Sequence, residues 1–211
     1  MEDGDWIRID FTGRVKATGE VFDLTSEQEA RALGIYDQKQ RYGPRLVILG
    51  KHMILPALED EIKKMSVGEE RRIELENAFG IRNPAFIKII PIAHFLKQKI
   101  NPAPGMLVDI DGILAKIQSV SGGRVRVDFN HPLAGKTVVY DVKVVEKIER
   151  AEDKVRAYLE YIGVKADVKF EAGNVEIITE KVLDKAVEEK IKNDLSQIKG
   201  IENIKFTTLK A

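Results

Sequence analysis

The residue types that most often carry out enzyme chemistry are sparse in this sequence. The chain of 211 residues has no cysteine, which excludes disulfides, thiol nucleophiles and cysteine-based zinc sites. His52, His94 and His131 lie far apart and lack the spacing of metal ligands. There is no recognisable nucleophile–base triad and no glycine-rich phosphate loop. We therefore predict no metal and no cofactor, and the aromatic residues become the candidates for function.

The aromatic residues occupy two kinds of sequence context. Phe11, Phe22 and Tyr140 lie in segments in which apolar and polar residues alternate, a pattern typical of half-buried strands. Taken alone, most such rings are simply core residues. Phe79 lies instead in the turn-rich residues 76–84, ENAFGIRNP. It could be a core plug, an exposed recognition ring, or the hinge of a segment that begins after it.

Composition limits the classes of function. Apolar residues make up 44% of the chain and charged residues 32%, enough for a buried core and a well-solvated surface. Lys and Arg together number 34, as do Asp and Glu, so the basic excess of a nucleic-acid binder is absent. We find no secretory signal and no apolar run long enough to span a membrane. We expect a soluble, cytoplasmic protein, and abundant Lys, Glu and Ile without Cys favour a thermophilic source.

Periodicity predicts the elements that must position the aromatic residues. Polar residues 25–44 are interpreted as a surface excursion, and a short helix is expected to begin at Pro56 and end before Gly68. An apolar stripe marks the buried face of that helix: Leu58, Ile62 and Met65. Strands are predicted over residues 6–15, 21–23, 45–49, 70–76 and 136–148.

Residues 85–131 change in character. Three short strands are predicted over 106–110, 113–120 and 124–129, joined by tight glycine turns. The apolar residues of 85–100 have two interpretations: they form the core of a small unit, or they form an exposed groove that binds chains. We expect a mixture of the two. The sequence does not decide which of these side chains point outward: Phe86, Ile89, Ile90, Phe95 and Met106.

Residues 151–211 are predicted to form a separate unit with the order α-β-β-α-β. Its helices are expected over 151–162 and 181–198, with Val182 on the apolar face of the second helix. Its strands are expected over 165–171, 174–179 and 203–209. A unit of this size is marginal alone. We therefore expect it either to dock on the rest of the chain or to form a homodimer.

Five stretches resemble, in order, the FKBP-type peptidyl-prolyl isomerases. They are DFTG at 10–13, VFD at 21–23, LGKHMILPALEDEIKKMSVGE at 49–69, AFG at 78–80 and VVYDVKVV at 138–145. The segment NHPLAGKT at 130–137 resembles the end of the insert-in-flap domain of SlyD-like and archaeal long-type members, and residues 25–44 also look like the archaeal long type. Together these stretches are far more specific than any one of them.

The resemblance implies an α+β fold in which a twisted antiparallel sheet wraps a short helix. A hydrophobic pocket is then expected between the sheet and the helix. Residues 1–84 and 132–150 would form the isomerase domain, with residues 85–131 as a small, β-rich insert-in-flap chaperone domain. Residues 151–211 would form a C-terminal α/β domain, which resembles the extra domain of some archaeal members.

The resemblance also implies a function. The chain would be a peptidyl-prolyl cis-trans isomerase that binds unfolded polypeptides through the insert, with proline-containing chains as partners and weak binding of macrolide inhibitors. The family uses a backbone N–H at the position of Leu55 to hold the substrate carbonyl, and Leu58 stands on the pocket floor. The positions that match the family's pocket are Phe11, Phe22, Asp23, Ile54, Leu55, Leu58, Phe79 and Tyr140.

Two departures from the family pattern bear on activity. The usual strand tyrosine is Phe11 here, and the usual loop tyrosine is Phe79, so both rings lack a hydroxyl. A lost hydrogen bond of this kind costs about 0.5–1.5 kcal/mol. We expect a slower isomerase. The alternative is a holdase with little or no turnover, and a remote third reading, an RNA-associated factor, is disfavoured by the zero net charge.

Overall fold

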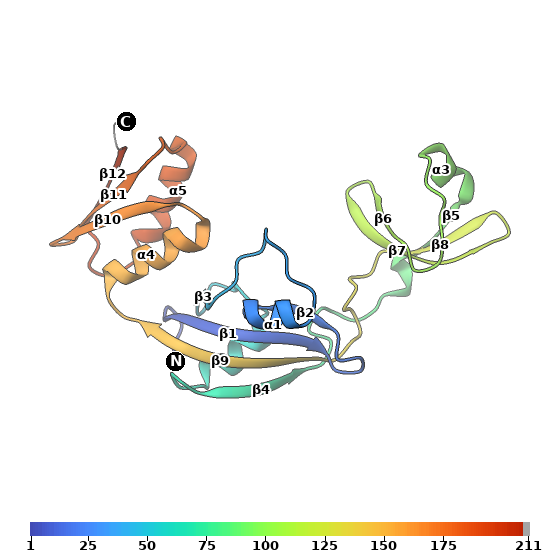
Figure 1. The fold of residues 1–211 in the computed structure, drawn as a ribbon, viewed down its shortest axis with the longest axis horizontal. Coiled ribbons are helices and arrows are strands. Elements are labelled where there is room, and N and C mark those ends of the chain that lie inside the picture. The colour runs from blue at the N-terminus through green and yellow to red at the C-terminus, as the bar shows by residue number, and fades with distance from the viewer. Residues whose placement is uncertain (209–211) are drawn as a thin grey trace. The chain divides into compact units, whose positions relative to one another are not determined.

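The computed structural model describes residues 1–208, whose strands form three sheets (Figure 1). The first sheet has five strands in the order β2-β1-β9-β4, with β3 paired to β1. Its strands are β1 (Trp6–Val15), β2 (Val21–Leu24), β3 (Arg45–Ile48), β4 (Glu70–Leu75) and β9 (Val138–Ile148). The order places β2, β1 and β9 side by side, which brings together strands far apart in the sequence.

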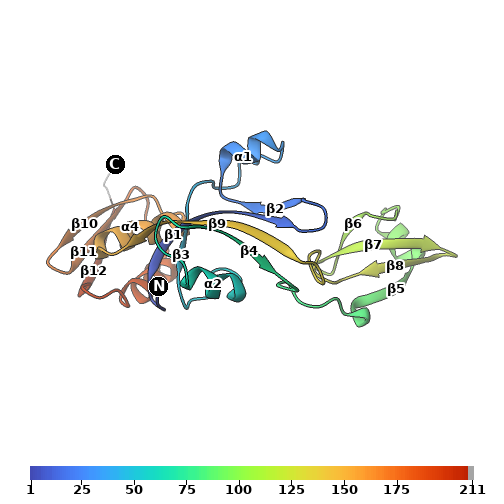
Figure 2. The same ribbon diagram turned by 90° about the horizontal axis from the view of Figure 1, so that it is seen from below.

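Two short helices accompany this sheet. Helix α2 (Pro56–Lys63) lies beside the sheet in Figure 2. The predicted stripe of Leu58, Ile62 and Met65 is confirmed as buried, with 2%, 0% and 2% of each residue exposed. Helix α1 (Glu27–Ala32) falls within residues 25–44, which we expected to form a surface excursion, and only Ala30 of this helix is buried. Ser26 begins α1, because its side chain accepts the N–H of Glu29, an N-cap signal present in the sequence.

The second sheet has four antiparallel strands in the order β5-β8-β7-β6. These are β5 (Ile87–Pro91), β6 (Leu107–Ile110), β7 (Ile113–Ser121) and β8 (Arg124–Asp128). The 3₁₀ helix η1 (Pro84–Phe86) precedes β5, and α3 (Ile92–Lys97) follows it. A small core fills one face of the sheet, formed by Phe95, Val108, Ala115, Ile117, Val125 and Val127.

The third sheet belongs to the C-terminal residues, whose predicted order α-β-β-α-β is present. The elements are α4 (Ala151–Ile162), β10 (Ala166–Glu171), β11 (Asn174–Thr179), α5 (Lys185–Leu195) and β12 (Asn203–Thr208). Strands β10 and β11 form an antiparallel hairpin. Strands β11 and β12 are parallel, because α5 carries the chain back across the sheet between them.

The second C-terminal helix is shorter than predicted. Helix α5 begins at Lys185 after the extended N-cap Asp184, and the predicted start near Lys181 is wrong. The hydroxyl of Thr179 donates to the Lys181 carbonyl, which holds this stretch in a turn. Val182 is 81% exposed instead of lying on a buried face. The last predicted strand is described as far as Thr208, and Leu209 lies outside the described residues.

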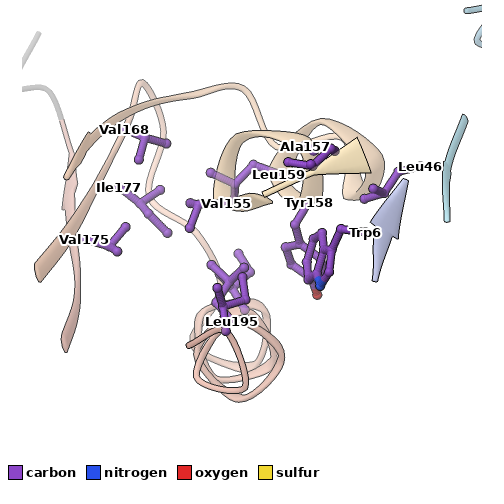
Figure 3. Packing of buried hydrophobic residues seen from close by; sticks show 13 residues of the cluster. Trp6, Leu46, Val155, Ala157, Tyr158, Leu159, Val168, Val175, Ile177 and Leu195 are labelled. Atoms are coloured by element: carbon purple, nitrogen blue, oxygen red, sulfur yellow. The ribbon is translucent and has the colours of Figure 1, made fainter. Parts of the chain in front are cut away.

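The C-terminal helices pack on β1 and β3 through one apolar cluster (Figure 3). Trp6 of β1 and Leu46 of β3 lie in this cluster with Val155, Tyr158 and Leu159 of α4. The two aromatic rings lie with their centroids 6.5 Å apart. The C-terminal residues therefore dock on the strands that precede them, the first of the two expected arrangements.

The described chain divides into two compact units. The first contains residues 1–13, 21–73 and the chain from residue 140 onward, and the second contains residues 14–20 and 74–139. The fold mixes helices with mostly antiparallel sheets, as the family resemblance implies. None of the helices within residues 1–208 is both long and apolar enough to cross a membrane.

Candidate active site

Three adjacent strands of the first sheet bring three aromatic rings together. Phe11 on β1 and Tyr140 on β9 are each only 4% exposed, and Phe22 on β2 is half-buried. The ring centroids of Phe11 and Tyr140 lie 5.8 Å apart, and those of Phe22 and Tyr140 lie 5.6 Å apart. Both contacts have edge-to-face geometry, which aromatic pairs prefer because ring edges are positive and ring faces negative. We call these three residues the aromatic cluster.

Gly13 permits the close approach of these rings. A Cβ atom at this position would lie 2.8 Å from the ring of Phe22 and 2.9 Å from the ring of Tyr140. Both distances are shorter than real Cβ contacts, so any larger residue would push the rings away. Gly13 belongs to the DFTG motif at residues 10–13, but no role was predicted for it from the sequence. Glycine is required at this position for steric reasons, which become evident only in the packed structure.

An ion pair borders the aromatic cluster. The guanidinium of Arg45 donates to both carboxylate oxygens of Asp23, at 3.0 and 3.1 Å. The Arg45 Cζ atom also lies 4.7 Å from the centroid of the Phe11 ring, where the positive charge meets the electron-rich face. Asp23 was predicted as a pocket residue, whereas Arg45 was missed. No sequence signal links the two, because they come from different strands.

Burial keeps the Tyr140 hydroxyl protonated. Loss of hydration, together with the negative charge of Asp23, raises the pKa of Tyr140 to about 12, although Arg45 opposes this shift. At neutral pH the phenol is therefore uncharged and can donate a hydrogen bond. The cluster thus offers an apolar aromatic surface with one hydroxyl and one ion pair, and no described group in it acts as a nucleophile.

Three predicted pocket residues lie at the start of α2. Leu55 is the N-cap of the helix and makes no side-chain capping hydrogen bond, and Pro56 follows at the first helical position. Ile54 and Leu55 are half-buried, whereas Leu58 is 2% exposed. The structure thus fixes Leu58 in the core. The placement of these three residues in a pocket with the aromatic cluster stays a prediction.

Phe79 lies in the second unit and is half-buried, so it is neither a fully buried plug nor a fully exposed ring. Its ring stacks parallel on the imidazole of His131, with centroids 4.8 Å apart and an interplanar angle of 0°. His131 Nδ1 in turn accepts the N–H of Leu133 at 3.2 Å. His131 was missed, because the two stacked residues are far apart in sequence. The role of Phe79 in the pocket stays a prediction.

The two ends of the second sheet's chain segment are tied together near Phe79. The Asn83 N–H donates to Asn130 Oδ1 at 2.8 Å, and Asn130 Nδ2 donates to the Asn83 carbonyl at 3.1 Å. Asn130 Nδ2 also donates to Asp128 at 2.7 Å, and Arg82 forms an ion pair with Asp128. These contacts fix where the chain enters and leaves the four-stranded sheet.

The structure decides which apolar residues of this second sheet point outward. Phe95 is 4% exposed and belongs to the core, and Ile90 packs partly against it. The sequence also left the orientation of three further residues open, and they are exposed: Phe86 by 53%, Ile89 by 65% and Met106 by 39%. Further exposed apolar side chains are Leu96, Leu107, Ile113 and Leu114. The expected mixture of core and surface roles is present.

Leu107 and Leu114 lie on the same face of the β6–β7 hairpin. Leu107 pairs with Lys116 and Leu114 pairs with Asp109, which makes the two leucines diagonal neighbours across the hairpin. They are 55% and 57% exposed. They add to the exposed apolar side chains named above, and each pairs with a charged residue on the same face.

Family models match two overlapping parts of the chain. The model described as FKBP-type peptidyl-prolyl cis-trans isomerase matches residues 1–93. The model described as FKBP26, IF domain matches residues 88–133. The second match begins within β5 and ends three residues after Asn130.

Curated relatives carry the same description. A short-type peptidyl-prolyl cis-trans isomerase of Methanocaldococcus jannaschii is 33% identical over 146 residues, which cover 68% of this chain and 92% of that protein. The FKBP-type isomerase SlyD of Helicobacter pylori is 32% identical over 141 residues, covering 62% and 75%. An FKBP-type 16 kDa isomerase of Escherichia coli is 33% identical over 110 residues, covering 49% and 73%.

Proposed function

The chain belongs to the FKBP-type peptidyl-prolyl cis-trans isomerase family, and from this premise we propose how it works. It accelerates rotation about X–Pro bonds at the aromatic cluster, and it holds unfolded polypeptides through the exposed apolar side chains of residues 85–131. The observation that carries the first part is the edge-to-face packing of Phe11, Phe22 and Tyr140.

The physics of X–Pro rotation suits such a site. Rotation crosses a barrier of about 20 kcal/mol, because it breaks the resonance of the amide. The twisted bond is less polar than the planar one, since charge separation between oxygen and nitrogen is lost. A dry aromatic surface therefore stabilises the transition state more than the ground state. No metal, nucleophile or tuned acid is needed for this step.

The described residues supply what this mechanism needs. The half-buried Phe22, backed by the packed rings of Phe11 and Tyr140, would meet a proline ring, and the protonated Tyr140 hydroxyl would donate to a substrate carbonyl. The Asp23–Arg45 ion pair holds a guanidinium over Phe11, which limits the rotation of that ring. We propose that Ile54, Leu55, Leu58 and Phe79 complete the pocket, with the Leu55 N–H as a second donor.

A protease-free exchange assay on a short Ala-Leu-Pro-Phe type peptide tests the isomerase. We expect measurable turnover in the wild type and a rise of roughly twofold to tenfold in kcat/KM for Phe79→Tyr, because the added hydroxyl supplies one hydrogen bond to the peptide. The matched control is Phe170→Tyr in the C-terminal sheet, which adds the same hydroxyl elsewhere. The isomerase proposal fails if the wild type is inactive and Phe79→Tyr restores nothing.

The second part of the proposal rests on the four-stranded sheet. Its edge strands β5 and β6 carry the exposed Ile89 and Leu107, so an extended chain could pair with an edge and bury its apolar side chains beside them. Unfolded polypeptides expose both unpaired backbone and apolar side chains. We propose that residues 85–131 form the domain that takes them up, with the isomerase domain over 1–84 and 132–150 and a C-terminal domain over 151–211.

Suppression of client aggregation tests the holding activity. The double variant Leu107→Asp and Leu114→Asp should lose most of it, because charge on this face prevents apolar burial. Short-peptide isomerase activity should stay within about twofold, since both residues belong to the second unit and the aromatic cluster belongs to the first. The matched control is Ser121→Asp, an exposed position on the same strand as Leu114. Full suppression by the double variant would place client binding elsewhere.

The loss of both family hydroxyls, at Phe11 and Phe79, favours one alternative: a holdase whose pocket recognises proline segments with little turnover. The two assays separate the functions, because a holdase suppresses aggregation while the exchange assay shows no catalysis even at saturating peptide. Weak macrolide binding, a homodimer through the C-terminal residues, an archaeal source and a cytoplasmic location stay predictions.

A further inference from the structure

Residues 50–55 connect β3 to α2 and contain Ile54 and Leu55, two of the proposed pocket residues. Gly50 and His52 have positive φ angles of 83° and 53°, so this stretch follows neither a helix nor a strand path. Its position must therefore be set by contacts from outside. Those contacts come from α2 on one side and from the C-terminal residues on the other.

Helix α2 holds the start of the segment through a buried carboxylate. Glu59 is 1% exposed, and its Oε1 accepts the Gly50 N–H at 2.5 Å. Lys63 Nζ lies 3.5 Å from the same oxygen, and His52 Nδ1 lies 4.0 Å from Oε2. The carboxylate thus ties residue 50 to the helix that Leu55 caps, and the Glu59 N–H donates to the Leu55 carbonyl at 2.9 Å.

The C-terminal residues contact the middle of the segment. Lys51 Nζ donates to Gln197 Oε1 at 2.8 Å. Met53 Sδ accepts the Ile48 N–H at 3.3 Å and lines a cavity of about 290 Å³. The opposite wall of that cavity comes from the C-terminal residues, namely Tyr158, Tyr161, Ile162, Lys190, Asp194, Gln197 and Ile198.

This opposite wall is anchored to the sheet independently of residues 50–55. Tyr158 packs against Trp6 of β1, and its hydroxyl is hydrogen-bonded to Asp194 of α5. Arg8 of β1 donates to Glu160 of α4 at 2.6 Å. Figure 3 shows Tyr158 and Trp6 together in the apolar cluster. The surface that contacts Lys51 and lines the cavity opposite Met53 is therefore fixed.

We propose that the C-terminal residues position the proline pocket: Gln197 holds Lys51, Ile198 lines the cavity opposite Met53, and together they limit the positions open to Ile54 and Leu55. This inference rests on the isomerase function proposed above. Lys51, Met53, Gln197 and Ile198 are positioning residues in this scheme and do not touch the peptide. The C-terminal residues would then influence the affinity of the pocket for peptide, whether or not they also bind a partner.

Variants of the full-length chain test this positioning. Ile198→Ala removes apolar contact from the cavity wall, and Gln197→Ala removes the hydrogen bond to Lys51 from an exposed site where folding is not at risk. The control is Ile191→Ala, since Ile191 is 0% exposed in the same apolar cluster but does not line the cavity. The readouts are amide hydrogen exchange of residues 50–55 and the separate values of KM and kcat for a proline peptide.

We expect exchange of residues 50–55 to accelerate by roughly twofold to tenfold in Ile198→Ala and by less in Gln197→Ala. KM should rise over a similar range with a smaller change in kcat, and Ile191→Ala should change exchange and KM by less, because Ile191 does not line the cavity. Unchanged exchange at residues 50–55 in both variants overturns the proposal, as does an equal change in Ile191→Ala. An inactive wild type would contradict the isomerase function, whereas the exchange data would still decide the positioning.

Discussion

The aromatic cluster and the four-stranded sheet both contain apolar side chains. The cluster buries them, whereas the sheet leaves several of them exposed. Phe11 and Tyr140 are each 4% exposed and meet across adjacent strands, whereas Leu107 and Leu114 are more than half exposed on a hairpin. Apolar residues occur on both faces of that hairpin, because the inward Val108 and Ala115 alternate with outward leucines.

This difference matches the two purposes that we propose for apolar side chains in this protein. Rings packed edge to face give a site of fixed shape, which suits stabilisation of one transition state. Exposed leucines on a sheet with open edges give a surface that accepts many sequences, since apolar burial is not directional. Damage to the packed rings should therefore impair turnover alone, and damage to the sheet should impair chain binding alone.

The largest effect is expected for Gly13→Ala. The new methyl group would displace the rings of Phe22 and Tyr140, so kcat/KM should fall by about an order of magnitude or more, and stability by about 1–3 kcal/mol. Aggregation suppression should be unchanged. Adding Phe22→Leu should restore part of the stability, because a smaller side chain relieves the clash. Wild-type kinetics in Gly13→Ala would refute the fixed-shape interpretation.

Asn130→Ala should destabilise the junction between the two ends of the segment that forms the four-stranded sheet. Asn130 is 9% exposed and bonds both Asn83 and Asp128, so its loss leaves buried polar groups unpaired and should cost about 1–3 kcal/mol of unfolding free energy. Chemical denaturation measures this loss, and short-peptide turnover should persist. Asn83→Ala is the control, since its side chain only caps Ala85 and its loss should cost about 1 kcal/mol. Equal losses would contradict the central role of Asn130.

Alkaline pH should destabilise the aromatic cluster through Tyr140. Its pKa rises from 10.0 to about 12 on folding, so the stability it contributes is complete below pH 10 and is lost as the pH rises through 12. Compared with Tyr140→Phe, the wild type should lose about 2–3 kcal/mol over this range. Unfolding free energies at several pH values measure the difference. Parallel pH profiles for the two proteins would show that Tyr140 is not the group responsible.

The smallest effect is expected for Asp23→Asn. The Asp23 and Arg45 side chains are about one-third exposed, so their pair should contribute only about 0.2–1 kcal/mol. The same change should loosen Arg45 over Phe11 and raise KM for a proline peptide by about twofold. Arg72→Gln, which breaks an exposed ion pair with Asp141, serves as the control and should leave KM unchanged. An equal KM effect in both would remove any special role of Asp23.

Local sequence patterns predicted much of the fold. Alternation gave β1 and β9, and the helical stripe gave the buried face of α2, since both periods follow from backbone geometry. The start of α5 was misjudged, because Lys181–Asp184 has helix-forming composition but is held in a turn by Thr179. The bounds of helix α1 were not predicted within residues 25–44, although Ser26 and Glu29 gave an N-cap signal.

The candidate site was predictable only in part. Ordered motifs pointed to Phe11, Phe22, Asp23 and Tyr140, which the structure gathers on neighbouring strands. No local pattern could indicate the supporting contacts of Gly13, Arg45 and His131. Each contact joins side chains from separate strands or loops. Contacts between residues so far apart in the chain cannot be identified from a single sequence.

The sequence by itself determined the local periodicities, the absence of cysteine chemistry and the ordered motifs that resemble one enzyme family. Tertiary structure alone decided which rings touch, which leucines point outward, and that α4 and α5 dock beside Lys51 and Met53. The physical reason is range. Backbone preferences act over a few residues, whereas packing selects among distant side chains by shape, and that selection exists only once the chain has folded.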